Sequence, residues 1–314
     1  QNGIAIQVGR QAWSTTGTAT ITNNIISGYQ KNGITVDNTG SNAIITGNII
    51  TGAGTTPTIA QNGLQVSRGA TATVTGNTIT GNSFHLTGNV SDWGSTGILL
   101  YQNGQVTLAG GNNLNGNDQN YYAFEPVGTI ALGAETFGSS TAPLGFGNQI
   151  VNVSSQDLDL RTSTFGGISP SVMTPTQLFE LEDYILHKID SLSYGFVYVK
   201  TNNTYVTPLS FVSSNAQIQR GIDAASAGFT VNVRAGAYAK QIAPNNSVFG
   251  VGSYQFGLSV DKNNLTVKGY GIGDAEVGTA MDAAVVFNTG ATNNFGSSGI
   301  FVQGNGVNGV SKTC

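Results

Sequence analysis

Charged side chains are scarce in this chain. Only 9% of its 314 residues are Asp, Glu, Lys or Arg, against roughly a quarter in an average soluble domain. The formal net charge is −4, and the 12 Lys and Arg residues are dispersed along the sequence. Because nucleic-acid binding needs a basic stripe that neutralises consecutive phosphates, we expect no nucleic-acid partner.

Cysteine and long apolar runs are also lacking. The single cysteine, Cys314, is the last residue, which excludes an internal disulfide and a cysteine metal site. No uninterrupted apolar stretch approaches the roughly 20 residues that cross a bilayer, so we expect no membrane span. The opening QNGIAIQVGR has none of the features of a signal peptide and is typical of a strand. It suggests a mature or excised piece of a longer protein.

The chain is instead rich in glycine, with 44 residues, and two short phrases alternate across residues 1 to 117. One is Asn/Thr-Gly followed by apolar residues at alternate positions, and it starts at Asn2, Asn32, Asn62 and Thr96. The other is apolar-Thr-x-Asn-x-apolar-x-Gly, and it starts at Ile21, Ile45 and Val74. Apolar residues at i and i+2 indicate strands. Their return after 24 to 34 residues is typical of a stacked repeat.

These repeats predict an all-β solenoid whose strands stack from coil to coil in parallel register, about 4.8 Å apart. The apolar residues of equivalent strands would then form ladders that point inward. One sheet would carry Ile4, Ile34, Leu64 and Ile98 in a first ladder and Ile6, Val36, Val66 and Leu100 in a second. Two further ladders would contain Ile21, Ile45 and Val74, and Ile26, Ile50 and Ile79.

Asparagine recurs at one position of the second phrase, as Asn24, Asn48 and Asn77. A side-chain amide at this position can bond to the equivalent amide in the coils above and below, which satisfies polar groups at a bend shielded from water. The alternative is that these are scattered loop residues of an antiparallel sandwich. A sandwich does not require the same residue in the same phrase three times, so we expect an Asn ladder.

The phrases ITGNIITG and VTGNTITGN resemble the coils of right-handed parallel β-helix proteins, the architecture of pectate lyases and of many secreted surface proteins. The resemblance covers residues 1–117 by motif and extends less clearly to about residue 166. It implies that residues 1–166 are the C-terminal part of a parallel β-helix.

Residues 167–212 break the pattern and are expected to form a connector. Thr174 and Pro175 make a helix start, and a helical stripe of Leu178, Leu181, Ile185 and Ile189 predicts a capping helix over 174–189. The segment YGFVYVKTNNTYVTP alternates like a hairpin. The connector resembles junctions between tandem β-helices in very large bacterial surface proteins.

Residues 213–314 resemble the opposite end of a β-helix, where a short helix caps the first coils. Ile218, Ile222 and Ala225 fit that helix, and Thr230 to Val233 fits a strand. Two arrangements stay open: successive solenoids in a tandem array, or residues 213–314 stacked beneath residues 1–166. Both arrangements leave strand edges with unpaired backbone hydrogen-bonding groups. We therefore expect copies of the chain or neighbouring modules to stack head to tail.

Few residues suggest chemistry. The Asp-Asp and Gly-His-Gly motifs of polygalacturonase-type hydrolases are absent. Lys31, Asp37 and Arg68 could lie on neighbouring coils as in a lyase, but ordinary solvent-facing charges are the simpler interpretation. A sugar contact is conceivable in the insertion with His85, Asp92 and Trp93, because aromatic rings stack on sugars and carboxylates accept hydroxyl bonds.

The other ionisable groups give no site. The segment DLDLR at 157–161 would offer Ca²⁺ only two ligands, which are too few. His187 has no second ligand at metal-binding spacing, so we interpret it as structural. We therefore expect no catalytic residue, no metal and no cofactor.

The sequence favours a non-catalytic structural or adhesive module of a secreted or cell-surface protein, bacterial in origin, which assembles into filaments or arrays. The rival interpretation is a polysaccharide lyase or a carbohydrate-binding β-helix protein with a cell-surface polysaccharide as its partner.

Overall fold

The computed structural model describes residues 3–86, 94–140, 149–209, 218–236, 238, 256–270 and 298–302. The chain divides into two compact units. The first comprises Gln1–Thr174, Asp183–Lys188 and Ser193–Val199, and the second comprises Pro175–Glu182, Ile189–Leu192 and Lys200–Cys314. The structure therefore splits the expected connector, 167–212, between the two units.

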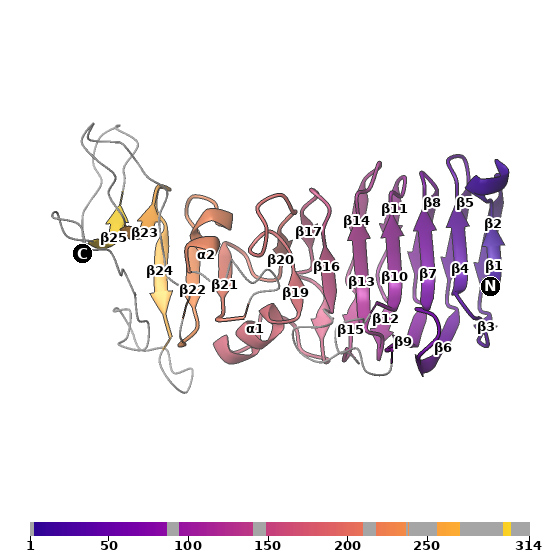
Figure 1. The fold of residues 1–314 in the computed structure, drawn as a ribbon, viewed down its shortest axis with the longest axis horizontal. Helices are drawn as coiled ribbons and strands as arrows, with labels where there is room; N and C mark the ends of the chain where they lie inside the picture. The colour runs from indigo at the N-terminus through magenta and orange to yellow at the C-terminus, as the bar shows by residue number, and fades with distance from the viewer. Residues whose placement is uncertain are drawn as a thin grey trace. The chain divides into compact units, whose positions relative to one another are not determined.

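The first unit is a coil of parallel strands in which successive turns contribute to three sheets (Figure 1). The first sheet contains β1 (Ile4–Val8), β4 (Asn32–Asp37), β7 (Asn62–Ser67), β10 (Thr96–Tyr101), β13 (Gln119–Phe124), β16 (Ile150–Asn152) and β19 (Ile185–Leu186). The second contains β2 (Thr18–Thr22), β5 (Asn42–Thr46), β8 (Thr71–Thr75), β11 (Val106–Leu108) and β14 (Ile130–Leu132). The third contains β3 (Ile25–Ile26), β6 (Ile49–Thr56), β9 (Thr78–Phe84), β12 (Asn113–Asn115), β15 (Thr136–Phe137) and β18 (Thr164–Phe165).

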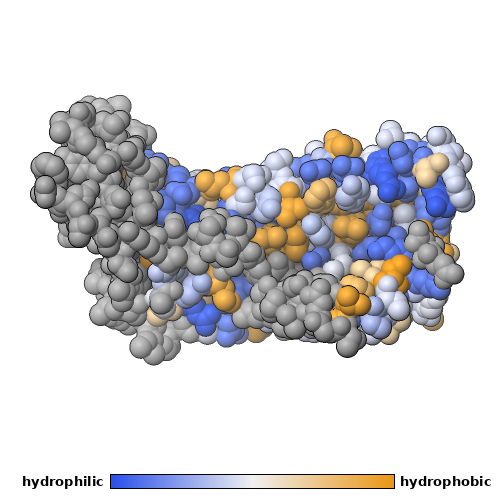
Figure 2. Space-filling view, viewed as in Figure 1, coloured by the Kyte–Doolittle hydropathy of each residue, from blue (hydrophilic) through white to orange (hydrophobic). Residues whose placement is uncertain are grey.

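Two smaller elements complete this unit. A short 3-10 helix, η1 (Gln11–Trp13), lies between β1 and β2. A parallel pair is formed by β17 (Leu158–Asp159) and β20 (Val197–Tyr198). On the face seen in Figure 2, the N-terminal coils present mainly hydrophilic residues with isolated hydrophobic ones.

Apolar side chains of the three sheets meet inside the coil and form the core. In the first sheet Ile34, Leu64 and Ile98 stack in register and are fully buried. Val36, Val66 and Leu100 form the adjacent ladder, also fully buried. The second and third sheets contribute Ile45, Val74, Ile50 and Ile79, each with no exposed surface. The alternation of inward and outward residues follows from the two-residue period of a strand.

The first coil is shifted by two residues from the expected register. Ile6, not Ile4, stands opposite Ile34, and Val8, not Ile6, stands opposite Val36. Ile4 is paired with Asn32 instead. The expected ladders were therefore wrong at this coil, because a shift of two residues keeps the same side chains inward and the period of the strand cannot detect it.

The glycine of the Asn/Thr-Gly phrase is required by close packing. A Cβ on Gly63 would lie 2.2 Å from Cγ2 of Ile79, and one on Gly33 would lie 2.6 Å from Cγ2 of Ile50. In these two coils the start of the first-sheet strand therefore passes directly over the inward side chain of the third sheet. Only a residue without a side chain fits there.

The expected capping helix is shorter in the structure. Helix α1 spans Pro175–Glu182 and contains the buried Leu178 and Leu181. Ile185 does not continue it, because Ile185–Leu186 form β19 and pair with Ile150 and Val151 of β16. Ile189 is buried but lies outside the helix. The hydrogen-bonding edge of β16 competes with the helix for this segment, and tertiary pairing overrides the helical pattern.

The expected hairpin is also absent. Its two strands, β20 and β21 (Asn203–Val206), do not pair with each other. β20 pairs in parallel with β17, and β21 pairs in parallel with β22 (Thr230–Val233). Asn202, with a left-handed φ of 54°, lies in the turn between them. The alternation that suggested a hairpin reflects two strands that each join a parallel pair.

The second unit has a parallel sheet of β21, β22 and β24 (Thr266–Gly269). Its backbone also contains α2 (Gln219–Ala224) and the parallel pair of β23 (Phe256–Val260) and β25 (Ser298–Val302). The ring of Phe179 on α1 packs edge-on against Tyr205 and Tyr270. Buried Arg220 and Asp190 form an ion pair of 2.9 Å. No helix in the described ranges has the length and apolarity needed to span a bilayer.

Two adjacent isoleucines of β6 test the core. Ile50 is fully buried, whereas Ile49 points outward and is 47% exposed. We predict that Ile50→Ala lowers the free energy of unfolding by about 2–5 kcal/mol through lost burial and a cavity. Ile49→Ala should lower it by less than about 1 kcal/mol. Urea denaturation followed by circular dichroism measures both, and equal losses would contradict the inward ladder.

Candidate functional site

The asparagines of the second phrase lie in a continuous ladder at one bend of the first unit. The side-chain amide of Asn24 donates to Oδ1 of Asn48 at 3.0 Å, and that of Asn48 donates to Oδ1 of Asn77 at 2.9 Å. Asn77 donates in turn to Oδ1 of Asn112 at 2.9 Å. Each acceptor oxygen also receives the backbone N–H of the preceding member. The amide therefore satisfies the neighbouring coil as both donor and acceptor.

The ladder changes chemistry after Asn112. Glu135 occupies the next position, and its carboxylate accepts the backbone N–H of Asn112 at 2.9 Å and that of Gly110 at 3.2 Å. Ser163 follows, with its Oγ accepting the N–H of Glu135 at 3.1 Å. Glu135 is almost completely buried. Burial raises the pKa of its carboxyl group, and the bonds from Asn112 and Gly110 only partly offset that effect.

Further Asn pairs were not foreseen in the sequence. Asn82 donates to Asn117 at 2.8 Å, and Asn62 donates to Asn32 at 3.0 Å. In the second unit Asn232 donates to Asn203 at 2.9 Å. The signal for the first two pairs was present, because Asn32 and Asn62 open the Asn-Gly phrase, and Asn82 and Asn117 each follow a phrase-ending glycine.

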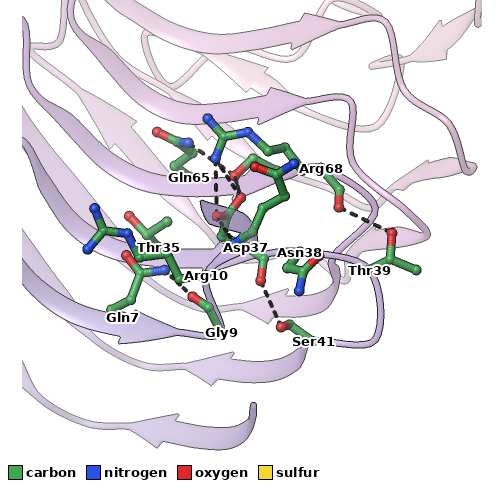
Figure 3. A network of polar contacts seen from close by, with 12 residues as sticks. Gln7, Gly9, Arg10, Thr35, Asp37, Asn38, Thr39, Ser41, Gln65 and Arg68 are labelled. Atoms are coloured by element: carbon green, nitrogen blue, oxygen red, sulfur yellow. Dashed lines mark hydrogen bonds and ion pairs between the residues drawn. The ribbon is translucent and has the colours of Figure 1, made fainter. Parts of the chain in front are cut away.

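Asp37 and Arg68 belong to a network of polar contacts in the first unit (Figure 3). Nη1 of Arg68 lies 3.0 Å from Oδ1 and 3.1 Å from Oδ2 of Asp37. The same carboxylate accepts the backbone N–H of Gln11 at 2.9 Å and the hydroxyl of Ser67 at 2.8 Å. Asp37 is buried, and Arg68 is 45% exposed. This carboxylate ties the ends of three successive coils together.

Lys31 does not join this cluster. It precedes β4, whereas Asp37 ends it, and six residues of extended strand span about 20 Å. Its ammonium group donates to the carbonyl oxygen of Ala60 at 2.7 Å. Burial lowers the pKa of Lys31. The structure therefore brings Asp37 and Arg68 together but does not assemble the three residues into a lyase centre.

The expected sugar contact is only partly described. His85 follows β9, is half-buried, and donates its backbone N–H to the carbonyl of Thr56 at 3.0 Å. Asp92 and Trp93 lie outside the described residues. The sugar contact stays a prediction.

The remaining acidic and histidine residues are tied to their surroundings. Asp159 pairs with Arg161 at 2.6 Å, and Asp157 accepts the N–H of Phe196 at 2.7 Å. His187 is buried, and its Nδ1 accepts the N–H of Val197 at 3.0 Å. Within the described ranges no group of three or more His, Cys, Asp or Glu residues is arranged to hold a metal ion.

The first sheet also carries an aromatic cluster that was not predicted from the sequence. The rings of Tyr101 and Phe124 stack 5.2 Å apart with an interplanar angle of 4°, and Tyr122 meets Phe124 edge-on. Tyr101 and Phe124 extend the row of Asp37 and Ser67, since all four are paired in register. The ring faces of the stacked pair are turned toward each other, so the pair bridges two coils.

The strand order, register and inward ladders define a parallel β-helix. Residues 5–155 match the family described as "Right handed beta helix region". This part of the chain is therefore a right-handed parallel β-helix. No curated protein and no solved structure gives a significant match to the chain.

Asn77 lies inside the ladder, with bonds to Asn48 and Asn112 and no exposed surface. We predict that Asn77→Ala lowers the free energy of unfolding by about 3 kcal/mol or more, because it leaves buried backbone groups of the adjacent coils unsatisfied. Asn24→Ala, at the exposed end of the ladder, should cost at most about 1 kcal/mol. Thermal and urea unfolding measure the difference, and similar costs at both positions would contradict a cooperative ladder.

Glu135 makes the stability of the first unit depend on pH. The pKa of the Glu135 carboxyl group is raised in the folded state. As pH rises, the unfolded chain therefore loses this proton at a lower pH than the folded chain does. The free energy of unfolding falls between the unfolded and the folded pKa and is constant above the folded pKa. We predict that Glu135→Gln removes this loss, so that the variant gains stability over the parent protein between mildly acidic and neutral pH. Urea unfolding across that range tests it. Glu125→Gln, at an exposed position, controls for the lost negative charge, and an equal gain there would refute the assignment.

Proposed function

We propose that the chain is a non-catalytic structural and adhesive module of a secreted or cell-surface protein. Its proposed role is structural: the β-helix lengthens when further coils stack on its end. The observation that carries the proposal is the constant parallel register of the first sheet, which runs through seven strands from β1 to β19. A strand at the end of such a sheet offers a template for another strand.

The end at β1 has the character of an incomplete stack. Ile34, Leu64 and Ile98 are fully buried inside the coil, whereas Ile6, the member of the same ladder on β1, is only half-buried. Within the described residues β1 pairs only with β4. A further coil placed on β1 would bury Ile4 and Ile6 and extend the three sheets. Copies of the chain, or a neighbouring module of a longer protein, are the partners that we propose.

The composition supports close lateral packing of such coils. The strands of the three sheets contain one charged residue, Asp37, and its charge is compensated by Arg68. Neighbouring molecules would therefore meet little electrostatic repulsion. Neutral polar side chains on the outside keep the surface hydrated without opposing that contact.

Assembly through β1 is tested by two lysine substitutions on that strand. Ile4 lies on the inward face and Ala5 is exposed on the outward face. We predict that the parent protein forms elongated assemblies at high concentration, measured by light scattering and electron microscopy. Ile4→Lys should prevent them, because an inward charge at a sheet edge blocks pairing.

Ala5→Lys adds the same charge to the same strand and should leave assembly intact. Circular dichroism of both variants verifies that the coil is folded. A parent protein that stays monomeric, or equal inhibition by both substitutions, would rule out stacking through β1.

A further inference from the structure

The outward face of the second sheet carries a grid of threonine side chains. In β2, β5 and β8 the outward positions are rows of three: Thr18, Asn42 and Thr71; Thr20, Ile44 and Thr73; and Thr22, Thr46 and Thr75. Seven of these nine positions are threonine, and Thr107 of β11 extends the middle row. The three strands lie side by side in coil order (Figure 1).

The spacing of this grid is fixed by the backbone. Side chains at i and i+2 of a strand lie about 6.6 Å apart, and equivalent side chains of adjacent strands lie about 4.8 Å apart. Pairing from β2 to β8 is continuous, without a register shift. The third sheet differs in this respect, since a register shift interrupts β6 and β9 between Thr51 and Gly54. The second sheet therefore presents two constant repeats at right angles.

The grid is neutral and consists mainly of threonine, with Asn42 and the exposed Ile44 at the other two positions. Each threonine offers a methyl group and a hydroxyl that both donates and accepts, on a β-branched side chain with restricted χ1. The strands TATIT, NAIIT, TATVT, VTL and IAL contain no ionisable residue. Thr71 donates to the carbonyl of Ser41 at 3.3 Å, whereas no side-chain bond within the described residues engages Thr20, Thr22 or Thr73. These hydroxyls are available to a ligand.

Three classes of partner fit this surface poorly. Small-ligand sites, including those for sugars, are typically concave and lined by aromatic side chains with a few polar or charged groups, and a nucleic acid needs cations. The core of a protein interface is typically aromatic or rich in Met and Arg. No aromatic, Met or charged residue stands in the five strands of the second sheet. A partner that is itself a flat, neutral lattice of hydrogen-bonding groups matches the regular spacing and the hydroxyls of this surface.

We propose that the threonine grid of β2, β5 and β8 binds the surface of ice. The oxygen atoms of hexagonal ice repeat along two perpendicular directions with spacings close to those of the grid. Methyl groups at a fixed spacing order the water between them, and the hydroxyls anchor that water by hydrogen bonds. Water that bridges two polar groups is nearly as favourable as a direct hydrogen bond, and immobilising it costs little entropy. This activity is independent of assembly through β1, which uses the strand edge and not the outward face.

Ice affinity is measured by partition of the fluorescently labelled full chain into a slowly growing ice hemisphere, together with the shape of single ice crystals. We expect the parent protein to enter the ice and to facet the crystals. The double variant Thr20→Tyr and Thr73→Tyr should be excluded from the ice, because two large rings destroy the flatness of the grid. Thr51→Tyr, on the exposed outward face of the third sheet, is the matched control and should behave as the parent.

The double variant is folded if its circular dichroism spectrum matches that of the parent protein. A milder variant carries Thr20→Ser and Thr73→Ser. It should weaken ice binding, because it removes only the two methyl groups. Exclusion of the parent protein from ice would overturn the proposal. Equal loss of binding in the Thr51→Tyr control would also overturn it. A third result would overturn it as well: the parent protein does not bind ice but associates with itself as its concentration rises, and the double variant abolishes that association. The grid would then bind a second copy of the chain.

Discussion

The structure of the first unit depends on one constraint: each residue of a coil must lie about 4.8 Å above its counterpart in the next coil. Each side chain therefore packs against the side chains at the same position of the neighbouring coils and must be compatible with them. Apolar residues can satisfy this condition anywhere inside, because Ile34, Leu64 and Ile98 simply pack on one another. A buried polar residue can satisfy it only if the same group is both donor and acceptor. The side-chain amide of asparagine meets this requirement, which explains why Asn48, Asn77 and Asn112 recur where the chain bends.

The same constraint explains what happens where the ladder changes. Glu135 accepts from Asn112 as an amide oxygen would, but an ionised carboxylate cannot donate to the following coil. The next coil accordingly supplies Ser163, whose hydroxyl accepts the N–H of Glu135. The carboxylate keeps the geometry of the ladder while it introduces a buried charge, and the raised pKa is the consequence. The ladder is thus a continuous chain of hydrogen bonds with one ionisable member, Glu135.

Much of this could be predicted from the sequence, because a repeated phrase reports a repeated environment. The right-handed parallel β-helix was predicted and is confirmed. In coils two to four the residues of the expected inward ladders lie buried in the structure. The register of the first coil was not, since Ile4, Ile6 and Val8 all face inward and pattern alone cannot choose among shifts of two. Ile185 was assigned to a helical stripe, but in the structure it pairs with Ile150 at the edge of β16, a tertiary contact that the local pattern does not report. The sequence offered Asp37 and Arg68 as a possible pair on neighbouring coils but favoured solvent-facing charges. Asp37 is instead buried, and its bonds from Ser67 and Gln11 depend on tertiary geometry.

The scarcity of charge follows from the fold. If one strand position were charged in every coil, like charges would stand about 4.8 Å apart and repel by about 1 kcal/mol per pair even in water, with more in a partly buried row. A solenoid can avoid this repulsion only by alternating the sign of the charge from coil to coil or by having no charge at that position.

Here the eighteen strands of the three sheets contain one charged residue, Asp37. Its row continues as Ser67, Tyr101 and Phe124, and Arg68 supplies the opposite charge from the bend beside it. Threonine and asparagine stand at many of the other outward positions, where they stay hydrated without repelling their copies. A regular neutral surface is therefore a direct product of stacking identical coils.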